Sequence, residues 1–231
     1  MDRFKHLFYR AAIRGQSKII RRNPDDAAVY SRRGIAYRAL AQPERALADF
    51  DAEIRLNPDL ADTYLLRGVV YSDLNQHERA LADFDDAIRL NPDSAYAYYY
   101  RALANRHLER DEQAFADYDE ALRLDPNFTY AYQGRGAIHI DRAQPEQALA
   151  NFEMMVKRRP NDANAYYCRG VAYRDMEQYE QAIADFTTAI RLNPTFANAY
   201  RNRAFVFEKI QQHDRARADM DMVEKVERQK Q

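Results

Sequence analysis

The sequence contains one cysteine, no tryptophan and six glycines in 231 residues. Because Cys168 has no second cysteine to pair with, an intramolecular disulfide is excluded, which fits a reducing compartment. No apolar run approaches the roughly 18 residues that a membrane-spanning helix requires. The N-terminus also lacks the apolar core of a secretory signal. We therefore expect a cytoplasmic protein without stable membrane insertion.

An excess of charge of one sign is also missing from the chain as a whole. The net charge is -1, and 46% of the residues are hydrophobic, which argues against disorder and gives no support for a nucleic-acid partner. Residues 1–22, however, contain seven basic side chains and only one acidic side chain, so this segment carries +6. The rest of the chain must therefore sum to -7.

Catalytic and cofactor motifs are absent too. Gly134-Arg135-Gly136 resembles the start of a dinucleotide-binding loop, but no strand precedes it and His139 occupies the place of a third glycine. The five histidines have no paired metal spacing, although His107 and His139 could lie near each other. Cys168 could be exposed, but no motif places a base beside it, so a passive thiol is expected. We predict no enzyme, no cofactor and no metal site.

The residues that are present follow a strict period. Six prolines are 34 residues apart, and four of the six glycines keep one phase within this period: Pro24, Pro58, Pro92, Pro126, Pro160, Pro194, Gly34, Gly68, Gly136 and Gly170. Counting each repeat from Ala27 and its equivalents, place 4 is always tyrosine and place 20 is always alanine. Places 4, 8 and 11 share one helical face, and places 20, 24 and 27 share another. Each repeat therefore predicts two amphipathic helices, which cross closely where place 8 (Gly or Ala) meets place 20.

This pattern resembles the tetratricopeptide repeat: Tyr at place 4, Gly or Ala at 8, Tyr at 11, Ala at 20, Phe at 24, Ala at 27 and Pro at 32. The resemblance implies an all-α fold, a right-handed superhelix of helix pairs, in which the first helix of each pair lines a concave groove. We expect a basic N-terminal capping helix and joint (1–26), then repeats 27–60, 61–94, 95–128, 129–162 and 163–196, and a last repeat with a C-terminal helix (197–231).

Place 7 is arginine in all six repeats, and place 23 is aspartate in five of them. Antiparallel helices that meet through places 8 and 20 would bring places 7 and 23 together. We predict structural ion pairs between Arg33 and Asp49, Arg67 and Asp83, Arg101 and Asp117, Arg169 and Asp185, and Arg203 and Asp219. An arginine ladder that binds anions is the alternative. Because Asn151 replaces the aspartate in the fourth repeat, Arg135 should be the least neutralised arginine of the series.

Tyrosine is concentrated in the middle of the chain, where residues 96 to 100 read Tyr-Ala-Tyr-Tyr-Tyr. In the family, places 2, 5, 6, 9, 12 and 13 face the groove. We therefore predict a peptide-binding surface with exposed apolar and aromatic side chains and polar ends: Leu65, Leu66, Val69, Tyr96, Tyr99, Tyr100, Tyr130, Tyr167, Arg32, Arg106, Arg201 and Asn202. The alternative is that these rings stack on one another or on the next repeat and close the groove. The first repeat has Ser31 and Ile35 where some relatives place the Lys and Asn of a carboxylate clamp, so no such clamp is expected.

These features predict a non-catalytic scaffold or adaptor that binds a protein or peptide partner. A homo-oligomer built through the N-terminal helix or the C-terminal unit is the main alternative, and an RNA-binding solenoid is a weaker one because the repeats are acidic overall. The helix in residues 2–22 places Phe4, Leu7 and Phe8 on one face, with Gly15 as a possible kink. It is expected to cap the first repeat. A basic membrane-surface helix or a self-association arm are the alternatives.

Overall fold

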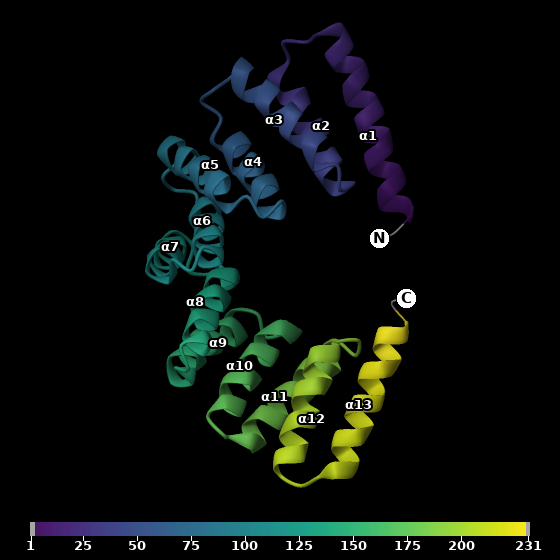
Figure 1. The fold of residues 1–231 in the computed structure, drawn as a ribbon, viewed down its shortest axis with the longest axis vertical. Helices are drawn as coiled ribbons and strands as arrows, with labels where there is room; N and C mark the ends of the chain where they lie inside the picture. Colours follow the sequence, from purple (N-terminus) through teal and green to yellow (C-terminus); the bar gives the residue numbers. More distant parts are fainter. Residues whose placement is uncertain (1–2, 230–231) are drawn as a thin grey trace. The chain divides into compact units, whose positions relative to one another are not determined.

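A computed structural model describes residues 3–229 (Figure 1). Residues 1–2 and 230–231, at the ends of the first and last expected segments, lie outside this range. The described part contains thirteen helices and no strand. The helices are α1 (Arg3–Arg22), α2 (Ala27–Ala39), α3 (Pro43–Leu56), α4 (Ala61–Asp73), α5 (His77–Leu90), α6 (Ala95–His107), α7 (Asp111–Leu124), α8 (Thr129–Asp141), α9 (Pro145–Arg158), α10 (Ala163–Asp175), α11 (Tyr179–Leu192), α12 (Ala197–Lys209) and α13 (His213–Arg228).

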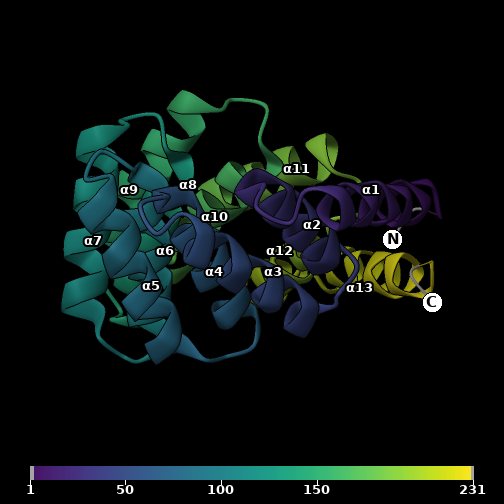
Figure 2. The ribbon, with the colours of Figure 1, turned by 90° about the horizontal axis from the view of Figure 1, so that it is seen from above.

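Each repeat segment contains one pair of helices that pack on each other, such as α2 with α3 and α4 with α5 (Figures 1 and 2). The residue between the two helices of a pair has a positive φ of 53° to 60° in all six repeats, and none of these residues is glycine. Where this residue is Ala41, its N–H donates to the Arg38 carbonyl, and the next N–H donates to the Tyr37 carbonyl. This hydrogen-bonding pattern ends the first helix and reverses the chain.

The core of each repeat lies at the crossing of its two helices. In the second repeat, Phe84 at place 24 is fully buried, and its ring lies directly beneath Gly68 at place 8. A Cβ atom added to Gly68 would lie 2.6 Å from Phe84 Cε1, so the glycine is required for this close approach. Ala80 at place 20 is also fully buried beside the ring. The periodic small and aromatic residues are thus one packing motif, used in successive helix pairs.

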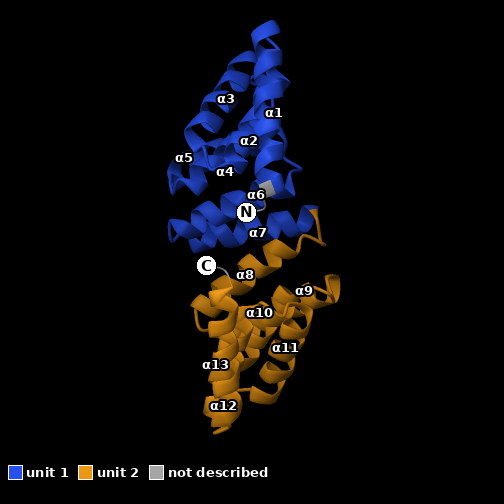
Figure 3. Cartoon of the chain, turned by 90° about the vertical axis from the view of Figure 1, so that its right-hand side faces the viewer, with its two compact units in different colours: residues 1–124 blue, residues 125–231 orange. Residues whose placement is uncertain are grey.

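The chain divides into two compact units, residues 1–124 and 125–231, coloured separately in Figure 3. Unit 1 contains α1 to α7, and unit 2 contains α8 to α13. Within each unit, the first helices of successive pairs contact one another: α2 with α4 and α4 with α6 in unit 1, and α8 with α10 and α10 with α12 in unit 2. We call the faces that these helices present the first-helix surface of each unit.

Candidate functional site

The five arginine–aspartate pairs lie at hydrogen-bonding distance, each with two parallel contacts. In the second repeat, Arg67 Nε donates to Asp83 Oδ2 at 2.9 Å, and Arg67 Nη2 donates to Asp83 Oδ1 at 2.6 Å. The same contacts, between 2.6 and 3.0 Å, join the other pairs: Arg33–Asp49, Arg101–Asp117, Arg169–Asp185 and Arg203–Asp219. Bidentate contacts of this kind fix geometry as well as adding energy.

Each of four arginines also has a third contact that the sequence analysis missed. Arg67 Nη1 donates to Asp51 at 2.7 Å, and Arg101 Nη1 donates to Asp85 at 2.7 Å. Arg33 contacts Ser17 Oγ at 3.0 Å, and Arg203 contacts Thr187 Oγ1 at 2.8 Å. These acceptors all occupy place 25 of the preceding repeat, or the equivalent position in α1. The acidic or hydroxyl residue that recurs at place 25 was the feature of the sequence that could have predicted these contacts. Each of these arginines therefore joins its own helix pair to the preceding one.

The electrostatics of the pairs suit a structural role. The aspartates are buried, and the arginines keep only part of their surface exposed. The hydrogen bonds that Arg67 donates to Asp83 hold the pKa of Arg67 above its ordinary value, although burial acts in the opposite direction. Burial raises the pKa of the Asp83 carboxyl, and the hydrogen bonds from Arg67 oppose that shift. Because their acceptors surround the guanidinium groups, these arginines offer little to an external anion.

The fourth repeat has a different contact at this position. Arg135 Nε donates to Asn151 Oδ1 at 2.7 Å, and Asn151 Nδ2 donates to the Gln147 carbonyl at 2.8 Å. The place-23 partner in this repeat is therefore neutral. That Arg135 is the least neutralised arginine of the series remains a prediction.

In unit 1, Tyr96 is the most exposed of the predicted tyrosines, with 57% of its surface accessible. Tyr99 and Tyr100 are half-buried. Their rings meet edge to face at a centroid distance of 5.2 Å, and the Tyr100 ring also stacks on Phe84 at 6.0 Å. The stacking alternative from the sequence therefore describes these two rings, which are less exposed than the groove prediction expects. Of these three rings, that of Tyr96 is the exposed one.

The predicted aliphatic residues of α4 lie deeper than expected. Val69 is 4% exposed, so the prediction of an exposed side chain at this position was wrong. It packs in a core with Phe84 and Ala104, and Leu65 is half-buried against the same core. Leu66 is half-buried against Phe50 and Val70. Neighbouring helices thus take up most of this apolar surface.

In unit 2, Tyr130 on α8 is 49% exposed, whereas Tyr167 on α10 is half-buried. The Tyr167 ring lies 4.9 Å from that of Phe196, and burial raises the pKa of its hydroxyl. Asn202 Nδ2 donates to this hydroxyl at 3.3 Å. Tyr167 and Asn202 are therefore brought together inside the unit, where they hold α10 and α12.

The polar residues predicted at the ends of the surface differ in their surroundings. Arg32 is exposed, and Arg106 is half-buried. Arg201 forms an ion pair with Glu227 of α13 at 2.8 Å. Sequence analysis missed Ile35 and Phe205, both at place 9, which are 44% and 49% exposed. Their place in the repeat was the available signal, because place 9 belongs to the set that faces the groove in the family.

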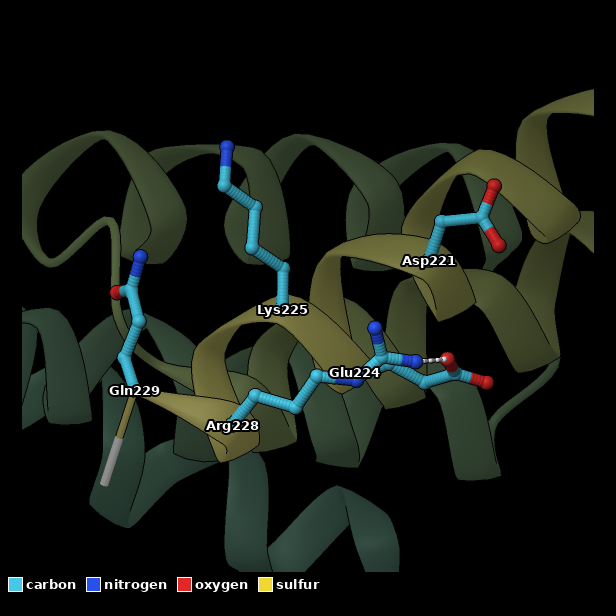
Figure 4. A pocket seen from close by; sticks show the side chains of 5 residues that line it. All are labelled: Asp221, Glu224, Lys225, Arg228 and Gln229. Atoms are coloured by element: carbon cyan, nitrogen blue, oxygen red, sulfur yellow. Dashed lines mark hydrogen bonds and ion pairs between the residues drawn. The ribbon is translucent and has the colours of Figure 1, made fainter. Parts of the chain in front are cut away.

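The remaining candidates for chemistry are buried or shallow. Cys168 is buried, which corrects the expectation of an exposed thiol, and burial raises its pKa to about 12. His107 of α6 stacks on His77 of α5, with ring centroids 4.5 Å apart. A depression of about 440 Å³ on α13 is lined by Asp221, Glu224, Lys225, Arg228 and Gln229 (Figure 4). All five residues come from one helix end, so this depression is open rather than an enclosed site.

Within residues 3–229, no group of three or more histidine, cysteine and acidic side chains is placed to hold a metal ion. No helix in the same range is long and apolar enough to cross a membrane.

Three family models, each described as tetratricopeptide repeat, match residues 65–127, 163–196 and 186–218. The helix pairs described above extend the same packing along the chain. The chain belongs to the tetratricopeptide repeat family. The predicted family and the predicted all-α fold of tandem helix pairs are thereby confirmed. Proteins of this family are typically non-catalytic scaffolds for protein–protein interaction.

Solved structures of the same fold align with most of this tetratricopeptide repeat chain. The hetero-tetramer Cut9–Hcn1 of the APC/C has a TM-score of 0.78 over 94% of the chain at 16% identity, and this chain spans 43% of that one. YrrB, described as a TPR protein with an unusual peptide-binding site, is 27% identical with a TM-score of 0.60, covering 80% of this chain and 95% of YrrB.

A further structure is MamA from Desulfovibrio magneticus RS-1, which is 27% identical with a TM-score of 0.65, covering 73% of this chain and 96% of that one. A comparison with curated protein sequences gave no significant match.

Proposed function

We propose that this protein is a non-catalytic scaffold that binds a peptide segment of a partner protein on the first-helix surface of unit 1, with Tyr96 as the central anchor. The exposed ring of Tyr96 is the observation that carries the proposal, since 57% of this large amphipathic side chain is accessible to a ligand. Tyrosine is enriched among the residues that dominate binding energy, because it buries a rigid face and keeps a hydroxyl group for hydrogen bonding.

The half-buried residues beside Tyr96 support this assignment. Tyr99, Tyr100 and Leu65 retain part of their surface while being fixed by the cores beneath them. A side chain that is held in place before binding loses little conformational entropy when a ligand arrives. The expected ligand is an extended or helical segment with apolar anchors. YrrB gives independent support, because a relative of similar length has a peptide-binding site.

The exposed residues of unit 2, Tyr130 and Phe205, provide a second surface of the same chemistry. Lys209 lies over the Phe205 ring at 5.4 Å, which adds positive charge beside an apolar centre. Arg174 lies over the same ring at 5.8 Å and is ion-paired with Asp175. We propose that this surface favours ligand residues that combine an apolar group with a nearby acid.

The test is to select peptides from a random displayed library on the full chain and to measure their affinity for variants. Tyr96→Ala should weaken the selected peptides by at least about tenfold, since a central tyrosine contributes roughly 2 kcal/mol. Leu56→Ala, at an exposed apolar position on the second helix α3, should leave binding unchanged. Both variants should keep the wild-type melting temperature. Selection of no peptide, or equal affinity for the wild type and Tyr96→Ala, would remove Tyr96 from the proposed site.

A further inference from the structure

The outer face of α1 carries exposed apolar side chains that the proposed peptide surface does not use. Phe4, Leu7 and Phe8 are 80%, 56% and 68% exposed, and Ile19 on the same helix is 42% exposed. Within unit 1, α1 packs on α2 alone, and its half-buried residues Tyr9, Ile13 and Ile20 share the opposite face. The helix is continuous from Arg3 to Arg22, through Gly15. Leu7 and Phe8 therefore remain exposed on the side of α1 that faces away from α2.

Positive charge flanks the exposed apolar residues of α1 and continues on the same side of the helix toward Arg22. Lys5, Arg10, Arg14, Lys18, Arg21 and Arg22 are all exposed, and residues 3–22 contain no acid. Within the described residues, none of these six side chains forms an ion pair. Six unpaired cations beside exposed phenylalanine and leucine call for a surface that is both anionic and apolar.

The second helix of each repeat packs against a first helix through places 20, 23 and 24. The outer face of α1 is poorly suited to such packing. By position, α1 continues the series of second helices, with Ala12 at place 20. Elsewhere, place 24 supplies a buried aromatic ring in five of the six repeats, and place 23 supplies a partner for the arginine of the first helix. Here these places hold Gln16 and Gly15. A first helix from a second copy would bring an arginine at place 7 against this basic face with no acid to accept it.

We propose that α1 is a membrane-surface helix that docks the protein on an anionic lipid bilayer. In this arrangement Leu7 and Phe8 enter the boundary between headgroups and acyl chains, and the basic side chains contact lipid phosphates and carboxylates. The remainder of the chain carries -7, so the membrane repels it and directs α1 toward the surface. Binding is peripheral and reversible, since one amphipathic helix does not cross the bilayer.

Flotation of the full chain with vesicles tests this proposal. Vesicles of phosphatidylcholine with phosphatidylserine should carry the protein, and vesicles of phosphatidylcholine alone should not. The double variant Leu7→Ser/Phe8→Ser should bind at least about tenfold more weakly, whereas Met220→Ser, which changes an exposed apolar residue on α13, should bind like the wild type. Because these side chains are exposed, helicity and melting temperature should not change.

A second pair of variants separates local charge from net charge. Changing Arg10, Arg14 and Lys18 to glutamine should weaken binding by roughly a hundredfold, at about fivefold per residue. The same change at Lys157, Arg158 and Arg159, the exposed basic residues at the end of α9, should have little effect.

Equal binding to both kinds of vesicle, or equal loss in the two triple variants, would overturn the proposal. So would a wild type that binds no vesicle but loses self-association in Leu7→Ser/Phe8→Ser, because α1 would then be a protein contact. Tyr96→Ala should leave vesicle binding intact, which separates this test from the peptide-binding one.

Discussion

At the scale of single residues, the arginine at place 7 shows how one side chain serves two levels of structure. Arg67 holds Asp83 within its own helix pair and Asp51 in the preceding pair. The two acceptors differ in their solvation, because Asp83 is buried and Asp51 is exposed. Solvent screening weakens an exposed pair, whereas loss of a buried partner leaves an uncompensated charge. The two contacts should therefore differ in energy although their distances are nearly equal.

This difference gives a prediction for Asp83→Asn and Asp51→Asn. Asp83→Asn should lower the free energy of unfolding by up to about 3 kcal/mol, because Arg67 then remains partly buried without its bidentate partner. Asp51→Asn should lower it by less than about 1 kcal/mol. Urea denaturation followed by circular dichroism measures both values. Equal losses in the two variants would show that burial does not set the energy of these contacts.

A second residue-scale prediction concerns Glu53, which is buried and accepts a hydrogen bond from Thr63 Oγ1 at 2.9 Å. Burial raises the pKa of Glu53 above its ordinary value. A raised pKa in the folded state means that the carboxyl group favours folding below its unfolded pKa of about 4.3, and that this contribution is lost as the pH rises through the folded value. Glu53→Gln removes the charge and keeps an oxygen for Thr63.

The melting temperature of Glu53→Gln relative to the wild type should therefore be higher at pH 7 than at pH 4. Calorimetry at the two pH values checks this. Glu44→Gln, on an exposed position of the same helix, serves as the control for a change in net charge and should show a smaller dependence on pH. A difference between Glu53→Gln and the wild type that does not depend on pH would contradict the expected role of burial.

At the scale of helices, the crossing of a pair depends on the absence of a single Cβ atom. A Cβ on Gly136 would lie 2.4 Å from Phe152 Cε1, and the same conflict occurs at Gly34, Gly68 and Gly170. The third and sixth repeats have Ala102 and Ala204 at place 8, and their place-24 residues are Tyr118 and Met220 rather than phenylalanine. The two places are therefore coupled by packing.

Gly136→Ala should destabilise the protein by about 1 to 3 kcal/mol, because the Phe152 ring must move within a filled core. Gly15→Ala provides a matched control, since no atom lies within 4 Å of the added Cβ. In that helix interior, alanine should stabilise by about 0.5 to 1 kcal/mol. Thermal unfolding of the two variants should therefore shift in opposite directions. A loss of stability in both would mean that glycine is needed in α1 for a reason other than space.

At the scale of the whole molecule, repeats that contact only their neighbours make stability local. Within unit 1 the α4–α5 pair contacts α3 on one side and α6 on the other, and within unit 2 the α10–α11 pair contacts α9 and α12. In contrast, α1 packs on α2 and α13 packs on α12 within their units. In such arrays the free energy of unfolding a segment is the sum of the intrinsic stability of its repeats and the energy of their interfaces with neighbouring repeats. It is not a single global value. The chain should therefore unfold from its end helices inward.

Hydrogen exchange read by mass spectrometry tests this expectation. Amides of α1 and α13 should exchange at least about tenfold faster than those of α4 and α5, whose pair has neighbours on both sides. Anionic vesicles should slow exchange in α1 if it docks on lipid, and should leave α13 unchanged. Uniform exchange along the chain would indicate one cooperative unit instead.

The sequence by itself determined the helix pairs, the family and the partners Arg67 and Asp83, because a fixed period sets which residues share a face and which places meet at a crossing. It did not reveal the contacts to place 25, since these join successive repeats and depend on how the repeats stack.

The solvent exposure of side chains at equivalent places of the repeats was also decided by tertiary structure. Val69 and Phe205 both occupy place 9, yet one is buried and the other is open. Tyr99 and Tyr100 likewise lose surface to each other, and Tyr100 also to Phe84, whereas Tyr96 keeps 57% of its surface exposed. The physical reason is that repeat position fixes the direction of a side chain, whereas the size and arrangement of neighbouring side chains fix how much of it water reaches.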